Sequence, residues 1–118
     1  MKINEIYQFF QTLPPIWLTP EMAACYALSM LLDKESYGVE LNEILHSQYP
    51  RYRLSDTVLY STLKFLEDEN IITSRWQKLK GRGRPRKMYS INPEHFSQAQ
   101  ELATFWRGYC NKYESFVA

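Results

Sequence analysis

The sequence predicts one small, mostly α-helical domain with a single β-hairpin, an N-terminal arm helix and a long C-terminal helix. Three observations support this prediction. Apolar residues recur at helical spacing in five segments of the 118-residue chain, two β-branched and aromatic segments flank a stretch rich in glycine and arginine, and charge is segregated. The net charge is only +1, but residues 75–87 hold seven of the 14 basic side chains and no acidic one. Such clustering favours a polyanionic partner.

The N-terminal arm is expected over residues 1–18. Apolar side chains at spacings of three and four predict a helix from Asn4 to about Gln11, and Pro14 and Pro15 prevent its continuation. We expect this arm to pack on something larger. The same segment lacks the unbroken apolar stretch of a signal peptide, and the longest apolar run, 11 residues over 22–32, is about half of the ~20 that span a membrane. A cytoplasmic, nucleoid-associated protein without a membrane partner is therefore expected.

The next two helices follow from their start and stop signals. Thr19 and Pro20 begin a helix that runs to about Leu32, and its nearly continuous apolar surface indicates burial on more than one face. After a polar break at residues 33–36, a further helix is expected from Tyr37 to Tyr49, ended by Pro50.

Another helix is expected from Ser55 and Asp56 to about Glu69. Its inner stripe consists of Val58, Leu59, Thr62, Leu63 and Leu66. Its outer face presents small or hydrogen-bonding side chains, namely Thr57, Tyr60, Ser61 and Lys64. Residues 71–76 and 87–91 have the composition of two strands, and the glycines and the proline between them predict a basic hairpin whose tip is too charged to be buried.

The last helix is expected over residues 93–118, and its apolar residues repeat at alternating spacings of three and four. Such a stripe is either intramolecular core or a subunit interface. Because two apolar seams share one long helix, we favour the interface. The candidate dimer-interface residues are Phe96, Ala99, Leu102, Ala103, Trp106, Tyr109, Cys110 and Tyr113.

Three helices followed by a basic hairpin, over residues 19–92, are the element order of a winged helix-turn-helix. A helix with an outward polar face fits the major groove of DNA, and neighbouring cations hold the phosphates. The Arg-Gly-Arg-Pro sequence at residues 82–85 resembles the AT-hook motif, so Arg82 and Arg84 are predicted to enter an A·T-rich minor groove. The candidate DNA-binding residues are Arg51, Arg53, Ser55, Thr57, Tyr60, Ser61, Lys64, Lys78, Lys80, Arg82, Arg84, Arg86 and Lys87.

From about Met22 to Asn92 the chain resembles the PadR-like winged-helix transcriptional regulators. The resemblance lies in residues 37–41, in Leu59-Tyr60, Leu63, Leu66-Glu67 and Ile71-Ile72, and in the wing block 84–91. It implies a homodimer held largely by the C-terminal helix, a two-fold symmetric operator and usually repression, sometimes relieved by a small molecule. The family usually has proline where this chain has Ser61.

The resulting hypothesis is a homodimeric transcriptional repressor that binds double-stranded DNA in a sequence-specific manner. Two alternatives stay open: a winged-helix module that binds an acidic protein surface without DNA, and an RNA-binding protein. Catalytic motifs and metal-ligand spacings are absent, so neither an enzyme nor a cofactor is expected, and Cys25 and Cys110 are expected to be reduced and inert. Trp106 and Tyr109 are candidates for an effector pocket, but simple packing is the favoured interpretation and no effector is indicated.

Overall fold

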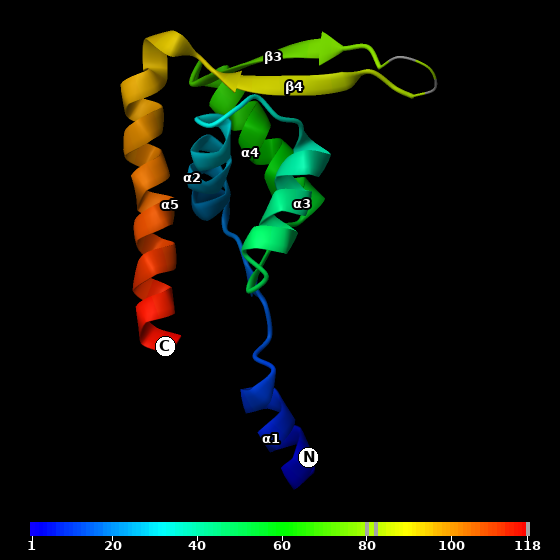
Figure 1. The fold of residues 1–118 in the computed structure, drawn as a ribbon, viewed down its shortest axis with the longest axis vertical. Coiled ribbons are helices and arrows are strands. Elements are labelled where there is room, and N and C mark those ends of the chain that lie inside the picture. The colour runs from blue at the N-terminus through cyan, green and yellow to red at the C-terminus, as the bar shows by residue number, and fades with distance from the viewer. Residues whose placement is uncertain (80, 82, 118) are drawn as a thin grey trace.

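The computed structural model describes residues 1–79, 81 and 83–117, with side chains as far as residue 112. Within these residues the fold is the expected mostly helical one with a small hairpin (Figure 1). The helices are α1 (Ile3–Gln11), α2 (Pro20–Leu31), α3 (Gly38–Gln48), α4 (Asp56–Asp68) and α5 (Phe96–Val117), with a 3-10 turn at Pro93–His95 before α5. The strands are β1 (Ile16–Trp17), β2 (Tyr52–Arg53), β3 (Ile72–Gln77) and β4 (Arg86–Ile91).

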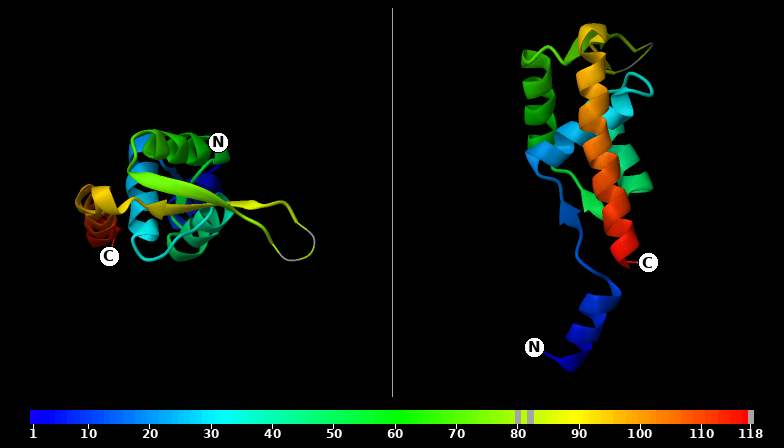
Figure 2. Two further views of the ribbon diagram at one scale, coloured as in Figure 1. Left: turned by 90° about the horizontal axis from the view of Figure 1, so that it is seen from above. Right: turned by 90° about the vertical axis from the view of Figure 1, so that its left-hand side faces the viewer.

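Helix α2 lies at the centre of the domain. The Thr19 side chain accepts a hydrogen bond from the backbone N–H of Met22, and Pro20 occupies the first turn, where an N–H has no helical partner. The helix packs against α5 on one side and α4 on the other (Figures 1 and 2), which confirms the burial on several faces predicted from its apolar surface. The Tyr26 hydroxyl donates to the carbonyl oxygen of Leu41 at 2.6 Å and so joins α2 to α3.

The sequence did not predict the small parallel sheet that β1 forms with β2. The backbone N–H groups of Ile16 and Leu18 donate to the carbonyl oxygens of Arg51 and Arg53, both at 2.9 Å. Leu18 is buried. These hydrogen bonds and this burial make residues 16–18, which were expected to belong to the arm, part of the domain. The sequence did not reveal this, because a two-residue strand is too short to show periodicity.

The N-terminal arm forms the expected helix, α1, but this helix is not packed against the core of its own chain. It projects away from the domain (Figures 1 and 2), and none of its residues is buried. The apolar face predicted to pack on something larger, which includes Ile3, Ile6, Tyr7 and Phe10, is exposed.

The wing is an antiparallel hairpin whose register pairs Ile72 with Ile91 and Gln77 with Arg86. Its base is anchored to the loop before α3, where Ser36 and Tyr89 exchange two backbone hydrogen bonds of 3.1 and 2.7 Å. Beyond this anchor the hairpin extends away from the helices (Figures 1 and 2). Gly81 and Gly83 adopt positive φ angles of 87° and 148°, which side chains disfavour, so glycine is required at this turn.

The apolar stripe of α5 faces α2 rather than solvent. Ala99, Ala103, Trp106 and Cys110 are 0, 0, 2 and 6% exposed, and the Trp106 ring meets three tyrosine rings at centroid distances of 5.2–5.4 Å. These four residues form core of this chain, so their assignment to a dimer interface is corrected. Helical spacing identifies a buried stripe but does not say which helix covers it.

The remaining residues of the expected interface are distributed differently. Leu102 is half-buried, and Phe96 and Tyr109 are 46 and 38% exposed. Phe105, which was not among the candidates, is 58% exposed on the same helix. The Tyr113 side chain lies outside the described residues.

Candidate nucleic-acid interface

Helix α4 has the expected two-sided character. It begins where the Ser55 side chain accepts a hydrogen bond from the backbone N–H of Val58 at 3.1 Å, so Ser55 serves as the N-cap. Leu59, Thr62, Leu63 and Leu66 are buried and Val58 is half-buried, which confirms the inner stripe.

The outer face of α4 exposes all four predicted side chains, Thr57, Tyr60, Ser61 and Lys64. The surroundings of these four side chains differ. Ser61 lies on the side of α2, where it lines a hollow of about 300 Å³ with Pro20 and Phe65. Tyr60 lies on the opposite side, toward the wing. Lys64 forms an ion pair of 3.3 Å with Asp68, but both side chains are largely exposed, so this pair is weak and leaves the ammonium group accessible.

Tyr60 and the wing border the same open groove of about 580 Å³. The ring of Tyr60 lies over Gly38 at the start of α3, so closely that a Cβ atom at Gly38 would come within 2.6 Å of it. The complete lining is Tyr37, Gly38, Val39, Tyr60, Trp76, Arg84, Pro85, Arg86, Lys87 and Tyr89. Of the four predicted residues on the outer face of α4, the tertiary structure thus brings Tyr60 together with the basic hairpin.

The wing cations have different surroundings. Lys78 and Arg84 are exposed. The Arg86 guanidinium lies 4.3 Å from the centre of the Tyr37 ring, a cation–π contact, and is half-buried. Arg75 forms an ion pair of 2.5 Å with Glu35. Lys80 and Arg82, both predicted to bind DNA, lie outside the described residues.

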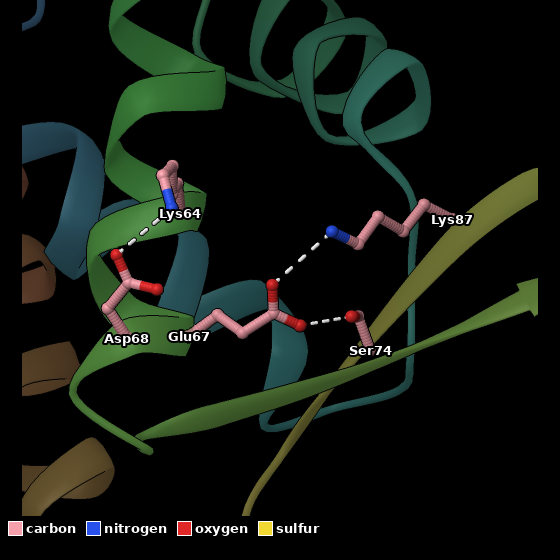
Figure 3. A network of polar contacts seen from close by, with 5 residues as sticks. All are labelled: Lys64, Glu67, Asp68, Ser74 and Lys87. Atoms are coloured by element: carbon pink, nitrogen blue, oxygen red, sulfur yellow. Dashed lines mark hydrogen bonds and ion pairs between the residues drawn. The ribbon is translucent and has the colours of Figure 1, made fainter.

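Lys87 is held by the protein itself. Its ammonium group lies 3.3 Å from a carboxylate oxygen of Glu67 on α4 (Figure 3). The other Glu67 oxygen accepts a hydrogen bond from the Ser74 hydroxyl on β3. The Ser74 hydrogen bond is the main cause that lowers the pKa of Glu67, and Lys87 adds to it, so the carboxylate is ionised at neutral pH.

Arg51 and Arg53 do not line this groove. Both are half-buried, Arg51 just before β2 and Arg53 within it, and the Arg53 guanidinium donates to the carbonyl oxygens of Pro50 and Tyr52 at 2.7 and 2.9 Å. Contact of these two residues with phosphates stays a prediction, as does the role of Thr57, which is exposed but does not line the groove either.

The candidate residues chosen from the sequence include four residues of the groove lining and omit the other six, among them Tyr37, Val39 and Trp76. Trp76 is 69% exposed on β3 and stands opposite Lys87 in the hairpin register. A tryptophan within the basic segment 75–87 was the signal that could have identified it, because aromatic side chains pack on sugars and bases as well as in cores.

Three further features of the described part of the chain concern metal ligands, membrane-spanning helices and thiol reactivity. No group of three potential metal ligands occurs among these residues, and none of their helices is long and apolar enough to cross a membrane. Burial raises the pKa of the Cys25 thiol, which keeps it protonated and poorly nucleophilic at neutral pH.

Comparisons with known proteins agree with this architecture. Residues 27–95 match the model of the transcriptional regulator PadR-like family. The crystal structure of the circadian clock associated protein Pex from Anabaena has 54% sequence identity and a TM-score of 0.86, over 97% of this chain and 99% of that one. Pex from Synechococcus sp. has 49% identity and a TM-score of 0.88, over 93% and 98%. A search of curated proteins found no significant match.

A more distant structure shares the fold alone. Bacillus subtilis PadR in complex with operator DNA has 22% identity and a TM-score of 0.58, over 66% of this chain and 44% of that one. The family match covers more than half of the chain, and the Pex structures match nearly all of it. The chain therefore belongs to the PadR-like family of winged-helix transcriptional regulators and is a regulator rather than an enzyme.

Proposed function

We propose that this regulator binds double-stranded DNA as a homodimer and represses transcription, with α4 in the major groove and the wing in a flanking A·T-rich minor groove. The observation that carries the proposal is the shared groove in which Tyr60 of α4 meets Arg84 and Trp76 of the wing. One stretch of duplex can contact both surfaces, because major and minor grooves alternate along the helix and phosphates lie between them.

The target proposed from the comparisons is a promoter of the circadian clock. Pex from Anabaena is described as circadian clock associated, and it is 54% identical to this chain. Bacillus subtilis PadR forms a complex with operator DNA on the same fold. We accordingly place the protein at the nucleoid. Sequencing of the genomic fragments that the protein retains will identify its operators, and a bound set without clock genes would contradict this part of the proposal.

The homodimer is proposed to form through residues 93–118 together with the arm. Phe96, Phe105 and Tyr109 expose apolar surface on α5, and Phe105 and Tyr109 line a hollow of about 260 Å³ between α5 and α2. The apolar face of α1 is also unburied, and we propose that the second copy of the chain covers it. Sedimentation equilibrium should show a dimer that Phe105→Glu converts to a monomer, whereas a monomer at all concentrations of wild type would contradict the assignment.

DNA binding itself is tested by fluorescence titration with random duplex DNA and with single-stranded RNA. We expect a preference for the duplex that falls steeply with salt. If a dimer neutralises about ten phosphates, the slope of log K against log salt should be near −9. Binding to neither nucleic acid would favour the alternative, a module that binds another protein.

A matched pair of variants tests the role of the wing. Arg84→Ala should weaken binding most on duplexes with A·T-rich flanks, because arginine is attracted to their narrow minor groove. Lys34→Ala removes the same charge from exposed surface outside the groove and outside residues 93–118, and should leave affinity nearly unchanged. Equal losses in the two variants would indicate a general charge effect and would contradict minor-groove recognition by the wing.

A further inference from the structure

We propose that Glu67 is the positioning residue that fixes the angle between the wing and the recognition helix α4, so that both surfaces meet DNA in register. The inference rests on the proposed function and adds to it a residue that does not itself contact DNA. It also gives Lys87 a different role from the DNA contact predicted from sequence.

The geometry of Glu67 is that of a clamp. It lies in the last turn of α4, and its two carboxylate oxygens bind different strands of the hairpin: one accepts from Ser74 on β3 and the other from Lys87 on β4 (Figure 3). In contrast, the nearby pair of Lys64 and Asp68 lies within α4 alone and cannot orient a second element.

Partial burial makes this clamp stronger than a surface ion pair. The side chains of Lys87 and Glu67 are 36 and 30% exposed, compared with 76 and 63% for Lys64 and Asp68. Water and salt screen a shielded pair less than an exposed one. The hydrogen bond from Ser74 adds a directional contact to the attraction between the charges.

Three other contacts of the wing go to a different element. Ser36, Glu35 and Tyr37, which bind Tyr89, Arg75 and Arg86, all belong to the segment before α3. Among the described residues, the polar side-chain contacts recorded between α4 and the hairpin are those of Glu67. Glu67 is therefore the residue whose side chain links the recognition helix to both strands of the wing through polar contacts.

A small tilt of the hairpin has a large effect at its tip. Gly83 is four residues beyond Lys87, about 13 Å at 3.3 Å per residue. A tilt of roughly 15° about the clamp would move the tip by about 3 Å, close to the ~3.4 Å of helix axis that each phosphate of one strand occupies. Loss of the clamp should thus separate the two readouts without removing any DNA-contacting side chain.

The test exchanges the two charges. Glu67→Lys and Lys87→Glu each place like charges together, whereas the double variant restores the ion pair with reversed polarity. Glu67→Gln is the milder variant, because its amide still accepts from Ser74. Glu69→Gln, at an exposed position two residues further on, is the matched control for charge. Circular dichroism and thermal melting identify any variant that fails to fold.

Two measurements report on the clamp. The first is the ratio of affinities for A·T-flanked and G·C-flanked duplexes around a half-site selected with the wild-type protein. The second, without DNA, is ¹⁵N relaxation of the hairpin amides. We expect each single charge reversal to reduce the flank ratio at least fivefold and to increase hairpin mobility, the double variant to recover at least half of both, and Glu67→Gln to be intermediate.

The inference is overturned if the double variant binds as poorly as Lys87→Glu while the hairpin amides stay as rigid as in the wild type, because Lys87 would then contact DNA directly. A wild-type protein without flank preference would instead contradict the proposed minor-groove function. In that case, relaxation alone decides whether Glu67 holds the wing.

Discussion

Replacing Trp106 with alanine tests the correction that moves this residue from a subunit interface to the core. The side chain is 2% exposed and is surrounded by the rings of Tyr26, Tyr49 and Tyr52, all at an angle to it. Phe105, its neighbour on α5, is 58% exposed and provides the matched control. The two substitutions remove aromatic groups from adjacent positions of one helix, one of them buried and the other exposed.

The expected magnitudes follow from burial. Truncation of a buried tryptophan to alanine costs about 3–5 kcal/mol of unfolding free energy, through lost transfer energy and the cavity that remains. For a chain of this length, an unfolding entropy of about 0.25 kcal/mol/K converts this cost to a fall in Tm of roughly 12–20 °C. Phe105→Ala should change the stability of the monomer by about 0.5 kcal/mol or less.

Thermal unfolding at several protein concentrations separates core from interface. If the protein is a dimer, its Tm rises with concentration, because association stabilises the folded state. Trp106→Ala should lower Tm at every concentration and keep this dependence, whereas Phe105→Ala should weaken the dependence. A Trp106→Ala protein that melts within about 3 °C of the wild type but no longer dimerises would refute the assignment of Trp106 to the core.

Three further predictions concern the groove and the clamp. Gly38→Ala should weaken duplex binding without lowering Tm, because the added Cβ displaces the half-exposed Tyr60 ring while alanine favours helix by up to ~1 kcal/mol; a large fall in Tm would show that the ring cannot move. Trp76→Ala should reduce affinity for duplex DNA by about tenfold at unchanged Tm, as measured by titration and melting, if its exposed indole packs on DNA. The pKa of Glu67 is lowered in the folded state, so the ionised carboxylate stabilises the folded protein. The difference in unfolding free energy between the wild type and Glu67→Gln should be full above the ordinary glutamate pKa of about 4.3 and vanish as pH falls through the lower folded value. Urea titrations that give the same difference in unfolding free energy at pH 3 and pH 7 would contradict this.

Local signals predicted most of the secondary structure. Thr19 and Ser55 cap the helices that follow them, Pro20 occupies a first turn, and the glycines of the wing adopt the positive φ angles for which they were considered turn residues. These signals act over a few residues, so they can be read without knowledge of the fold. The arm helix, the three central helices, both wing strands and the long last helix were found in this way.

The candidate site was predicted less completely. The sequence located the basic segment and the exposed face of α4, and the structure places Tyr60 in one groove with Arg84. The sequence did not indicate that Ser61 lies on the side of α2, that Arg53 binds backbone carbonyls, or that Trp76 lines the groove. Each of these depends on how elements rotate about their axes when they pack, and side-chain type does not fix that rotation.

The sequence by itself determined the helices, the hairpin and the segregation of positive charge, because capping, periodicity and charge density are properties of neighbouring residues. Only the tertiary structure decided which helix covers the stripe of α5, and that Lys87 pairs with Glu67, 20 residues earlier in the chain. The physical reason is that burial and ion pairing depend on contacts between distant segments. A buried apolar or charged side chain requires a partner, but its identity in the sequence does not specify which one.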